Sequence, residues 1–285
     1  MEIDIDTLFL SGCGTKGNAF IGSFKALIEH KIIDLEKIKR YVCCSGSSVI
    51  ILLLICNYSL NIIYKLSDRL KYDELLDLND LDILFDNLGV FSNQKIGKLV
   101  DCIIYKKFKK KNITLQEFYN LTKKEFICKV YNLSEKKEEY FSYQNHPDLK
   151  VSLLIQMTTC IPFFFKPIKY NNKYYIDGGI LCIMPFLKDY PNYLGIYIHS
   201  DKDRNIENMN FFEYFTYFNN CLANKYKFKK TKENERRIIN IYCINIPCVK
   251  FDVCKDEKDA LIDNGYDQTI QYLKKFDILN KIIKN

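Results

Sequence analysis

Residues 40–56 carry the side chains best suited to nucleophilic chemistry. Their sequence predicts a short apolar strand, a tight turn of glycine and serines, and a strongly apolar helix. A serine at such a turn stands on a sharp bend with its hydroxyl exposed, beside the first amides of the helix, where negative charge is favoured. We therefore predict Ser48 as the nucleophile and Gly46 as a glycine that supports the turn. A serine that only caps a buried helix is the alternative interpretation.

The nucleophile motif around Ser48 is incomplete. In the pattern G-x-S-x-G, Gly46 occupies the first glycine position, but Ile50 stands at the second. A branched side chain at that position either displaces Ser48 or is absorbed by repacking of its neighbours. Taken alone, the motif is therefore a weak indication.

A glycine run at 11–17 allows three interpretations. The spacing of Gly12, Gly14 and Gly17 fits a dinucleotide-binding fingerprint, but the next predicted strand does not end in the acidic residue that such a site requires. A phosphate-binding P-loop is excluded because Asn18 follows Gly17 where the motif needs Lys-Ser/Thr. The third interpretation is an oxyanion hole, whose backbone amides point at a developing negative oxygen. A simple strand-to-helix turn remains the structural alternative.

The tripeptide Asp177-Gly178-Gly179 offers a second reactive group. An acidic residue in an otherwise apolar neighbourhood, followed by two glycines, suits a carboxylate on a loop that passes close to a catalytic site. A plain turn is the alternative. The aromatic segment at 158–167, which has two prolines around three phenylalanines, suits either core packing or the wall of an acyl pocket.

Strands that alternate with helices must position these groups. The predicted strands cover 7–10, 38–44, 126–132, 139–143, 174–176, 193–199 and 238–246, and helical patterns occupy most of the sequence between them. This alternation predicts an α/β fold with a mainly parallel central sheet. We expect one domain over 1–285, with a helical insertion at about 58–125.

Composition limits the cellular context and the cofactors. The 285 residues include 12 cysteines and only three histidines, with no C-x-x-C motif, so a structural zinc site is not expected. The acidic N-terminus does not resemble a secretory signal, and no apolar run reaches the roughly 18 residues of a membrane span. We therefore predict a cytoplasmic protein with reduced, mostly buried thiols.

Two segments could bring the chain to a membrane surface. The net charge of +7 permits contact with anionic surfaces. A lysine-rich run lies at 105–111, and the aromatic segment 211–218 is followed by five lysines within 225–232. A solvated helix end and a core helix with a basic loop are the respective alternatives. Peripheral membrane contact is a prediction; a nucleic-acid partner is not predicted.

Three spaced motifs together resemble the patatin-like phospholipase family: SGCGTKG at 11–17, GSSVI at 46–50 and DGG at 177–179. Intermediate segments also fit this family: TLQEFY at 114–119, TTCIPFFFKP at 158–167 and LIDNGYDQTIQYL at 261–273. The resemblance covers about residues 7–275. Each motif alone is common, whereas the three in this order are specific.

The resemblance implies a three-layer α/β/α architecture and a Ser-Asp dyad that needs neither a catalytic histidine nor a metal or other cofactor. Ser48 matches the family nucleophile, and Asp177 matches its general base. The residues that match the oxyanion loop are Gly12, Cys13, Gly14, Lys16 and Gly17, and Gly178 and Gly179 support the turn after the base. Cys13 replaces a usual glycine, which is tolerable if its φ is negative.

The implied activity is that of a lipid acyl hydrolase of the phospholipase A type. Its substrates would be fatty acyl esters of membrane phospholipids or other glycerolipids, cleaved through an acyl-enzyme. The departures at Cys13 and Ile50 motivate an alternative, a catalytically weak or inactive lipid-binding relative. A nucleotide-binding oxidoreductase, supported only by the glycine spacing, is the third hypothesis.

Overall fold

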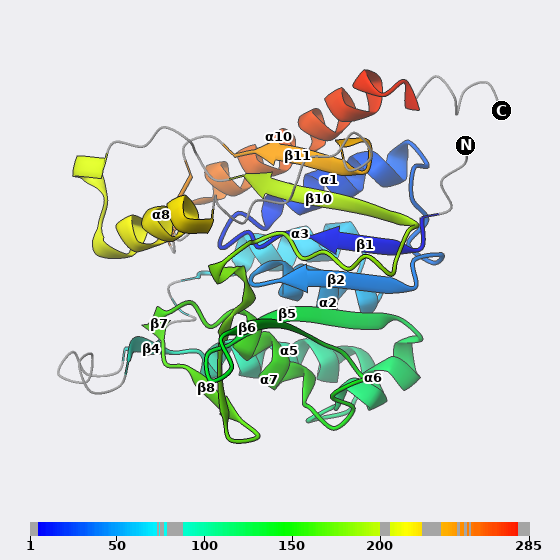
Figure 1. Cartoon of the computed structure of the whole chain (residues 1–285). Coiled ribbons are helices and arrows are strands. Elements are labelled where there is room, and N and C mark those ends of the chain that lie inside the picture. Colours follow the sequence, from blue (N-terminus) through cyan, green and yellow to red (C-terminus); the bar gives the residue numbers. More distant parts are fainter. Residues whose placement is uncertain are drawn as a thin grey trace.

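The structure is a computed structural model that describes residues 5–72, 74, 77–78, 88–199, 206–223, 235–243, 246–247, 250 and 252–278. Its centre is an eight-stranded mixed β-sheet, with most helices gathered behind it in the view of Figure 1. The predicted α/β fold with a mainly parallel central sheet is confirmed.

Five strands of this sheet run parallel, and they hold the glycine loop and the serine turn side by side. They are β1 (Thr7–Leu10), β2 (Arg40–Cys44), β5 (Glu125–Asn132), β10 (Tyr193–His199) and β11 (Ile238–Tyr242). The sheet order is β11-β10-β1-β2-β5-β9-β8. Because β1 and β2 are parallel neighbours, with Leu10 opposite Cys43, the loops that follow them leave the same edge of the sheet.

Three antiparallel strands complete the sheet and bring Asp177 to the same region. They are β6 (Lys137–Phe141), β8 (Ile168–Tyr170) and β9 (Lys173–Asp177). β9 pairs with β5, and Asp177 lies opposite Val130. Only β5 therefore separates Asp177, the last residue of β9, from β2, although Asp177 is far from β2 in sequence.

The two faces of the sheet are covered differently. Leu8 and Leu10 belong to the large core formed with the helices, whereas Phe9 belongs to a smaller cluster with Met184 and Tyr193 on the opposite face. The helices that contribute to the large core include α1 (Asn18–Glu29), α2 (Ser47–Ile55), α5 (Gln94–Phe108), α7 (Val151–Thr158) and α10 (Lys255–Lys275).

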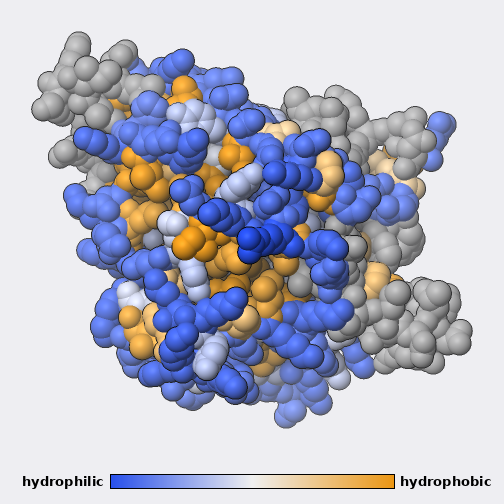
Figure 2. All heavy atoms as spheres, turned by 180° about the vertical axis from the view of Figure 1, so that it is seen from behind, coloured by the Kyte–Doolittle hydropathy of each residue, from blue (hydrophilic) through white to orange (hydrophobic). Residues whose placement is uncertain are grey.

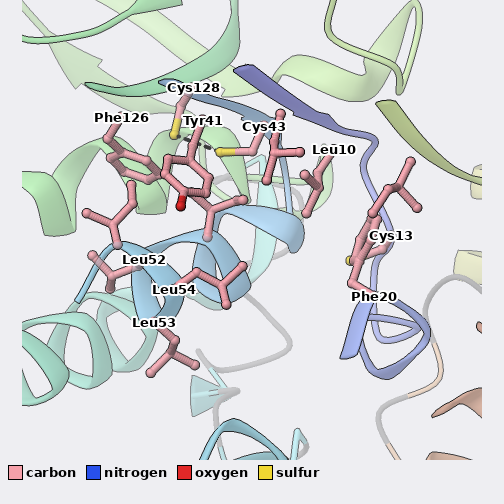
Figure 3. Packing of buried hydrophobic residues seen from close by; sticks show 14 of the residues in the cluster. Leu10, Cys13, Phe20, Tyr41, Cys43, Leu52, Leu53, Leu54, Phe126 and Cys128 are labelled. Carbon is pink, nitrogen blue, oxygen red and sulfur yellow. Dashed lines mark hydrogen bonds between the residues drawn. The ribbon is translucent and has the colours of Figure 1, made fainter. Parts of the chain in front are cut away.

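Helix α2, which follows the serine turn, is apolar on nearly all sides. It has seven buried residues among its nine. Figure 3 shows this helix below Tyr41 and Phe126, with Leu53 directed away from them. A helix that is apolar all round must be enclosed by other elements, so the position of the serine turn is fixed by the core.

Helices α1 and α10 approach each other unusually closely, through two glycines. A Cβ atom built on Gly22 would lie 1.8 Å from the Ile262 carbonyl oxygen, and one built on Gly265 would lie 2.0 Å from the Ala19 carbonyl oxygen. The Ser23 and Thr269 hydroxyls form a buried hydrogen bond of 2.7 Å between the same helices. The last helix thereby supports the helix that follows the glycine loop.

The segment predicted as a helical insertion, 58–125, contains strands as well as helices. Its helices include α3 (Leu60–Arg69), α5 and α6 (Leu115–Thr122), and its strands include β3 (Asp77–Leu78) and β4 (Gly89–Ser92). β4 pairs with β7 (Phe163–Phe165), part of the predicted aromatic loop. This long-range pairing explains why local periodicity missed both strands. The one-domain division remains a prediction.

The surface gives a limited view of possible lipid contact. Seen from behind, the molecule is mainly hydrophilic, with hydrophobic atoms exposed between the polar side chains (Figure 2). Among the described residues, no helix is both long enough and apolar enough to cross a membrane. The eleven cysteines within the described ranges are free, and seven of them are buried, so most of these thiols are buried as predicted.

Candidate active site

Ser45 occupies the sharp turn between β2 and α2. β2 ends at Cys44 and α2 begins at Ser47, so Ser45 directly follows the strand. Its φ is 57°, a left-handed conformation that is uncommon for a residue other than glycine. The Thr158 hydroxyl accepts a hydrogen bond of 2.9 Å from the Ser45 amide. A strained serine at a strand-to-helix turn has the geometry of a nucleophile elbow.

The Ser45 hydroxyl is paired with the carboxylate of Asp177. Ser45 Oγ donates a hydrogen bond of 2.5 Å to Asp177 Oδ2. The other carboxylate oxygen, Oδ1, accepts a bond of 2.7 Å from the Gly179 amide and lies 3.9 Å from Cys44 Sγ. Both oxygens of Asp177 are therefore held in place, and one of them points at a serine hydroxyl.

The environment of Asp177 suits proton transfer near neutral pH. Burial raises its pKa from 3.8 to about 6, although hydrogen bonds from Ser45 and Gly179 and the charge of Lys129 act in the opposite direction. The side chain is only 5% exposed. A carboxylate with such a pKa is ionised at neutral pH and is a stronger base than an exposed aspartate.

Ser48, which the sequence predicted as the nucleophile, is not the serine that contacts Asp177. It lies in the first turn of α2 with no exposed surface, and within the described part of the chain its hydroxyl has no hydrogen-bond partner. The difference arises because the helix begins at Ser47, two residues earlier than predicted. In a G-x-S-x-G alignment centred on Ser45, Cys43 and Ser47 take the two glycine positions. The feature of the sequence that could have identified Ser45 was the end of the strand at Cys44, since Ser45 directly follows it.

Gly46 has a steric role beside Ser45. A Cβ atom built on Gly46 would lie 2.5 Å from the Gly14 carbonyl oxygen, so the glycine permits close contact between the serine turn and the glycine loop. Ile50 lies outside the Ser45-centred motif. It packs near Gly17, where an added Cβ would meet Ile50 Cγ1 at 3.5 Å, so the branched side chain is accommodated there.

The glycine loop places Gly14 beside the Ser-Asp pair. Gly14 has a φ of 55°, and within the described ranges its amide has no hydrogen-bond partner. The Gly12 amide is already used, since it donates to the Ile183 carbonyl at 2.8 Å. Cys13 is absent from the described residues with positive φ, so its side chain causes no backbone strain. Gly14 thus lines the cavity of the Ser-Asp pair with an amide that no described residue uses.

Lys16, Gly17, Gly178 and Gly179 shape the surrounding loops. The Lys16 amide donates to the Cys13 carbonyl at 3.0 Å, and Gly17 caps α1. A Cβ on Gly178 would lie 2.3 Å from the Lys129 carbonyl oxygen, which explains the glycine after the acid. Gly179 supplies the amide that holds Asp177. Lys16 and Gly17 do not line the cavity described next.

A cavity of about 80 Å³ joins these groups. Ser45 and Asp177 line it together with the glycine-loop residues Gly12, Cys13 and Gly14. The remaining lining residues are Gly179, Ile180 and Ile183 after the acid, Ile161 and Pro162 before β7, and Phe215, Thr216 and Asn219 of α8 (Phe211–Ala223). The cavity is therefore polar around the Ser-Asp pair, and its other walls are mainly apolar, with Thr216 and Asn219 of α8 as polar exceptions.

Within the described residues, no group of three or more histidine, cysteine, aspartate or glutamate side chains could hold a metal ion. The absence of a cofactor remains a prediction. A larger cavity of about 340 Å³ lies between the β10–β11 edge and α10, where Tyr197, Asn240 and Tyr272 line it. It shares no lining residue with the cavity at Ser45.

Comparison with known proteins gives a family match for this chain. A family model described as patatin-like phospholipase matches residues 8–187, a range that contains both Ser45 and Asp177. The chain is similar to a "Probable lipid hydrolase 463L" of Invertebrate iridescent virus 6, with 32% identity over 203 residues, 70% of this chain and 66% of that relative. The chain thus spans slightly less than two thirds of that relative's length.

Solved structures share the fold at low sequence identity. VipD from Legionella pneumophila has a TM-score of 0.65 and 17% identity, over 95% of this chain and 67% of that chain. ExoU from Pseudomonas aeruginosa, in complex with SpcU, has a TM-score of 0.58 and 14% identity, over 95% of this chain and 52% of that one. The family match over most of its length shows that this chain belongs to the patatin-like phospholipase family.

Proposed function

We propose that this protein is a lipid acyl hydrolase that cleaves fatty acyl esters of phospholipids or other glycerolipids, with Ser45 as nucleophile and Asp177 as general base. The observation that carries the proposal is the 2.5 Å hydrogen bond from Ser45 Oγ to Asp177 Oδ2, inside a cavity shared with the glycine loop. Membership of the patatin-like phospholipase family supports the substrate class.

The first half of the reaction forms an acyl-enzyme. Asp177 takes the proton of the Ser45 hydroxyl while Oγ attacks the ester carbonyl, since a serine hydroxyl needs an adjacent base. The carbonyl oxygen becomes an oxyanion, which the Gly14 amide stabilises. The bond to the alcohol then breaks, and the proton on Asp177 passes to the departing oxygen.

The second half releases the fatty acid. Water loses a proton to Asp177 and attacks the acyl carbonyl, and the same amide stabilises the second oxyanion. Collapse of this intermediate breaks the bond to Ser45 Oγ, which recovers its proton from Asp177. The dyad ends in its starting state, so no proton is gained or lost by the enzyme.

The apolar side of the cavity suits an acyl chain. Ile161, Pro162 and Phe215 line the same cavity as the Ser-Asp pair, and the rings of Phe215 and Phe163 meet edge-on with their centroids 4.9 Å apart. Burial of methylene groups against such side chains is favourable by about 0.8 kcal/mol each. The aromatic segment at 158–167 thus serves partly as core and partly as a wall of the proposed acyl site.

The same end of the molecule presents the proposed membrane contact. Leu88, Phe163, Tyr214 and Phe218 are 66%, 50%, 48% and 48% exposed. Leu88 precedes β4, whose Gly89 pairs with Phe163 of β7, and the other two lie on α8. We call these four side chains the aromatic rim. The lysines at 225–232, also predicted to meet a membrane, lie outside the described residues.

A fluorophosphonate probe tests the nucleophile, because it reacts covalently with an activated serine. We expect the wild type to be labelled in the presence of phosphatidylcholine vesicles and Ser45→Ala to lose both labelling and phospholipid hydrolysis by about 10³-fold or more. Ser48→Ala, with its hydroxyl buried and out of reach of Asp177, should retain both. Loss of labelling in Ser48→Ala alone would restore the serine predicted from sequence, and no labelling of folded wild type would favour an inactive lipid-binding relative.

A further inference from the structure

Lys129 is a buried cation that the proposed chemistry does not use. It lies in β5 opposite Cys44, the residue before the nucleophile, and is 1% exposed. A lysine is almost never fully buried unless it is paired. Its ammonium lies 2.5 Å from Glu138 Oε1 and donates a hydrogen bond of 2.8 Å to the Cys182 carbonyl. The pairing therefore joins β5, β6 and the segment after Asp177.

The carbonyl that Lys129 holds belongs to a strap that connects the two halves of the site. We define the strap as residues 180–187, which follow the DGG tripeptide. One residue after Cys182, the Ile183 carbonyl accepts a hydrogen bond of 2.8 Å from the Gly12 amide. The Ile183 side chain lines the cavity. Lys129 is thus linked to the start of the glycine loop through two consecutive carbonyls.

A tyrosine holds the far end of this strap. The Tyr140 hydroxyl accepts a hydrogen bond of 3.1 Å from the Phe186 amide and donates one of 3.4 Å to the Phe186 carbonyl. Tyr140 lies opposite Lys129 in the β5–β6 ladder. The strap is therefore fastened at both ends by neighbouring side chains, and the ammonium is the charged fastening nearest the Ser-Asp pair.

Lys129 also supplies positive charge near Asp177. The titratable groups that face this carboxylate are the Cys44 and Cys160 thiols and the Lys129 ammonium. Burial raises the pKa of both thiols, so they stay neutral. Burial lowers the pKa of Lys129, but the ion pair with Glu138 and the other acidic groups around the ammonium leave its pKa raised. The ammonium therefore keeps its charge throughout the working pH range.

We infer that Lys129 is a positioning residue for the reaction, which holds the strap and the glycine loop in register with Asp177 and stabilises the ionised carboxylate. The inference rests on the proposed function, because it assumes that Asp177 acts as the base. Lys129 touches neither the substrate cavity nor the Ser45 hydroxyl; it acts through Cys182 and through its charge.

Substitutions that remove the charge of Lys129 or that of Glu138 should change the pKa of Asp177 in opposite directions. This difference separates the proposed role of Lys129 from simple structural support. Lys129→Met removes the ammonium and keeps a flexible apolar side chain of similar length, so the pKa of Asp177 should rise by about one pH unit. Glu138→Gln removes the partly exposed anion that offsets the ammonium, and should move the same pKa downward. Lys129→Arg keeps the positive charge, so the pKa of Asp177 should stay close to its wild-type value in this variant.

The measurement is kcat/KM against pH with a soluble p-nitrophenyl acyl ester, for wild type and the three variants, with folding checked by thermal melting. Lys124→Met is the matched control, because the Lys124 ammonium likewise holds backbone carbonyls but lies at the amino end of β5. It donates to the carbonyls of Leu35, Glu36 and Ile38. We expect this variant to lower stability and leave the pH profile unchanged. In Lys129→Met we expect kcat to fall about tenfold, with KM changed less than twofold.

Three outcomes would overturn the inference. The first is a folded Lys129→Met whose kcat/KM falls at acidic pH as it does in the wild type. The second is an apparent pKa that moves in the same direction in Lys129→Met and in Glu138→Gln. The third is an equal change of this pKa in Lys124→Met. If Lys129→Met does not fold, the Glu138→Gln result decides alone. Ser45→Ala, assayed in parallel, keeps the two proposals apart: activity in that variant rejects the nucleophile, whereas an inactive Ser45→Ala with an unshifted Lys129→Met rejects only the role of Lys129.

Discussion

At the scale of single residues, the main feature is a carboxylate buried where its charge is costly. Asp177 accepts hydrogen bonds from Ser45 and Gly179, yet burial still raises its pKa to about 6. Since the proposed base must be ionised to accept a proton, we expect kcat/KM to rise tenfold per pH unit below about pH 6 and to level off above it. A pH series with a soluble acyl ester checks this, and a profile flat from pH 4.5 to 8 would contradict it.

The same carboxylate should lower the stability of the folded protein at neutral pH. Its pKa is 3.8 in the reference state and about 6 when folded, a difference of about 3 kcal/mol. For an acid whose folded pKa is raised, the cost is absent below pH 3.8, grows between the two values and is complete above about 6. Asp177→Asn should therefore melt at higher temperature than wild type at pH 8, with the difference vanishing towards pH 4. A pH-independent difference would show that ionisation is not its cause.

The sequence and the structure single out largely the same residues for the candidate site and differ over the serine, for a physical reason. The acid, the two glycines after it and the glycine loop were all identified by type and spacing. The choice between Ser45 and Ser48 depended on where the strand ends and the helix begins. Cys43 and Ser47 occupy the motif positions where glycines were sought, and Gly46 alone suggested a different register. In the structure it is Ser45 that has the left-handed φ and the hydrogen bond to Asp177, and neither feature can be read from the sequence.

At the scale of elements, the contact between α1 and α10 depends on two glycines. Gly265→Ala would place a methyl carbon only 2.0 Å from the Ala19 carbonyl oxygen, much closer than the two atoms can approach. Overpacking of this kind typically costs about 1–3 kcal/mol, and the backbone of α1 cannot move aside as a side chain could. We expect a net loss of about 2 kcal/mol in the free energy of unfolding by urea denaturation. The exposed Asp267→Ala in the same helix is the control, and equal stabilities would contradict the close contact.

Local sequence patterns predicted most elements because their signals are local. The capping box of α6, in which Thr114 and Glu117 bond each other's backbone amides, is an example. β4 and β7 were missed because they are short and are stabilised by pairing with each other across about seventy residues. A glycine within a helix, such as Gly265 in α10, makes the helical pattern of a sequence less clear. The structure explains why this residue is a glycine, because α1 packs directly against it.

At the scale of the whole molecule, the cavity is small for a lipid, and α8 forms one of its walls. A volume of about 80 Å³ accommodates the ester group but not a long acyl chain, so binding requires the walls to adjust. The aromatic rim lies on the elements that form or adjoin those walls, α8 and the β4–β7 pair. Its exposed side chains would reach the lipid interface at the point where the substrate must enter.

Substitutions in the aromatic rim should weaken vesicle binding without affecting chemistry in solution. We expect Tyr214→Ser combined with Phe218→Ser to reduce binding to vesicles of phosphatidylcholine and phosphatidylserine by about tenfold, because two large aromatic groups would no longer be buried on contact. Hydrolysis of a soluble ester should change less than twofold. Tyr174→Ser removes a similarly exposed aromatic, 46% exposed on β9, and serves as control. Equal binding by all variants would reject the rim as the contact.

The placement of β10 and α10 limits how the catalytic region can be excised. The family match ends at residue 187, yet the whole length of β1 pairs with β10, and α10 lies against α1. A fragment cut at 187 would bare one edge of β1 and strip the cover from the helix behind the glycine loop. The part of the chain that matches the family model is therefore not expected to fold alone, because the sequence beyond residue 187 supports the strand and the helix next to the Ser45–Asp177 pair.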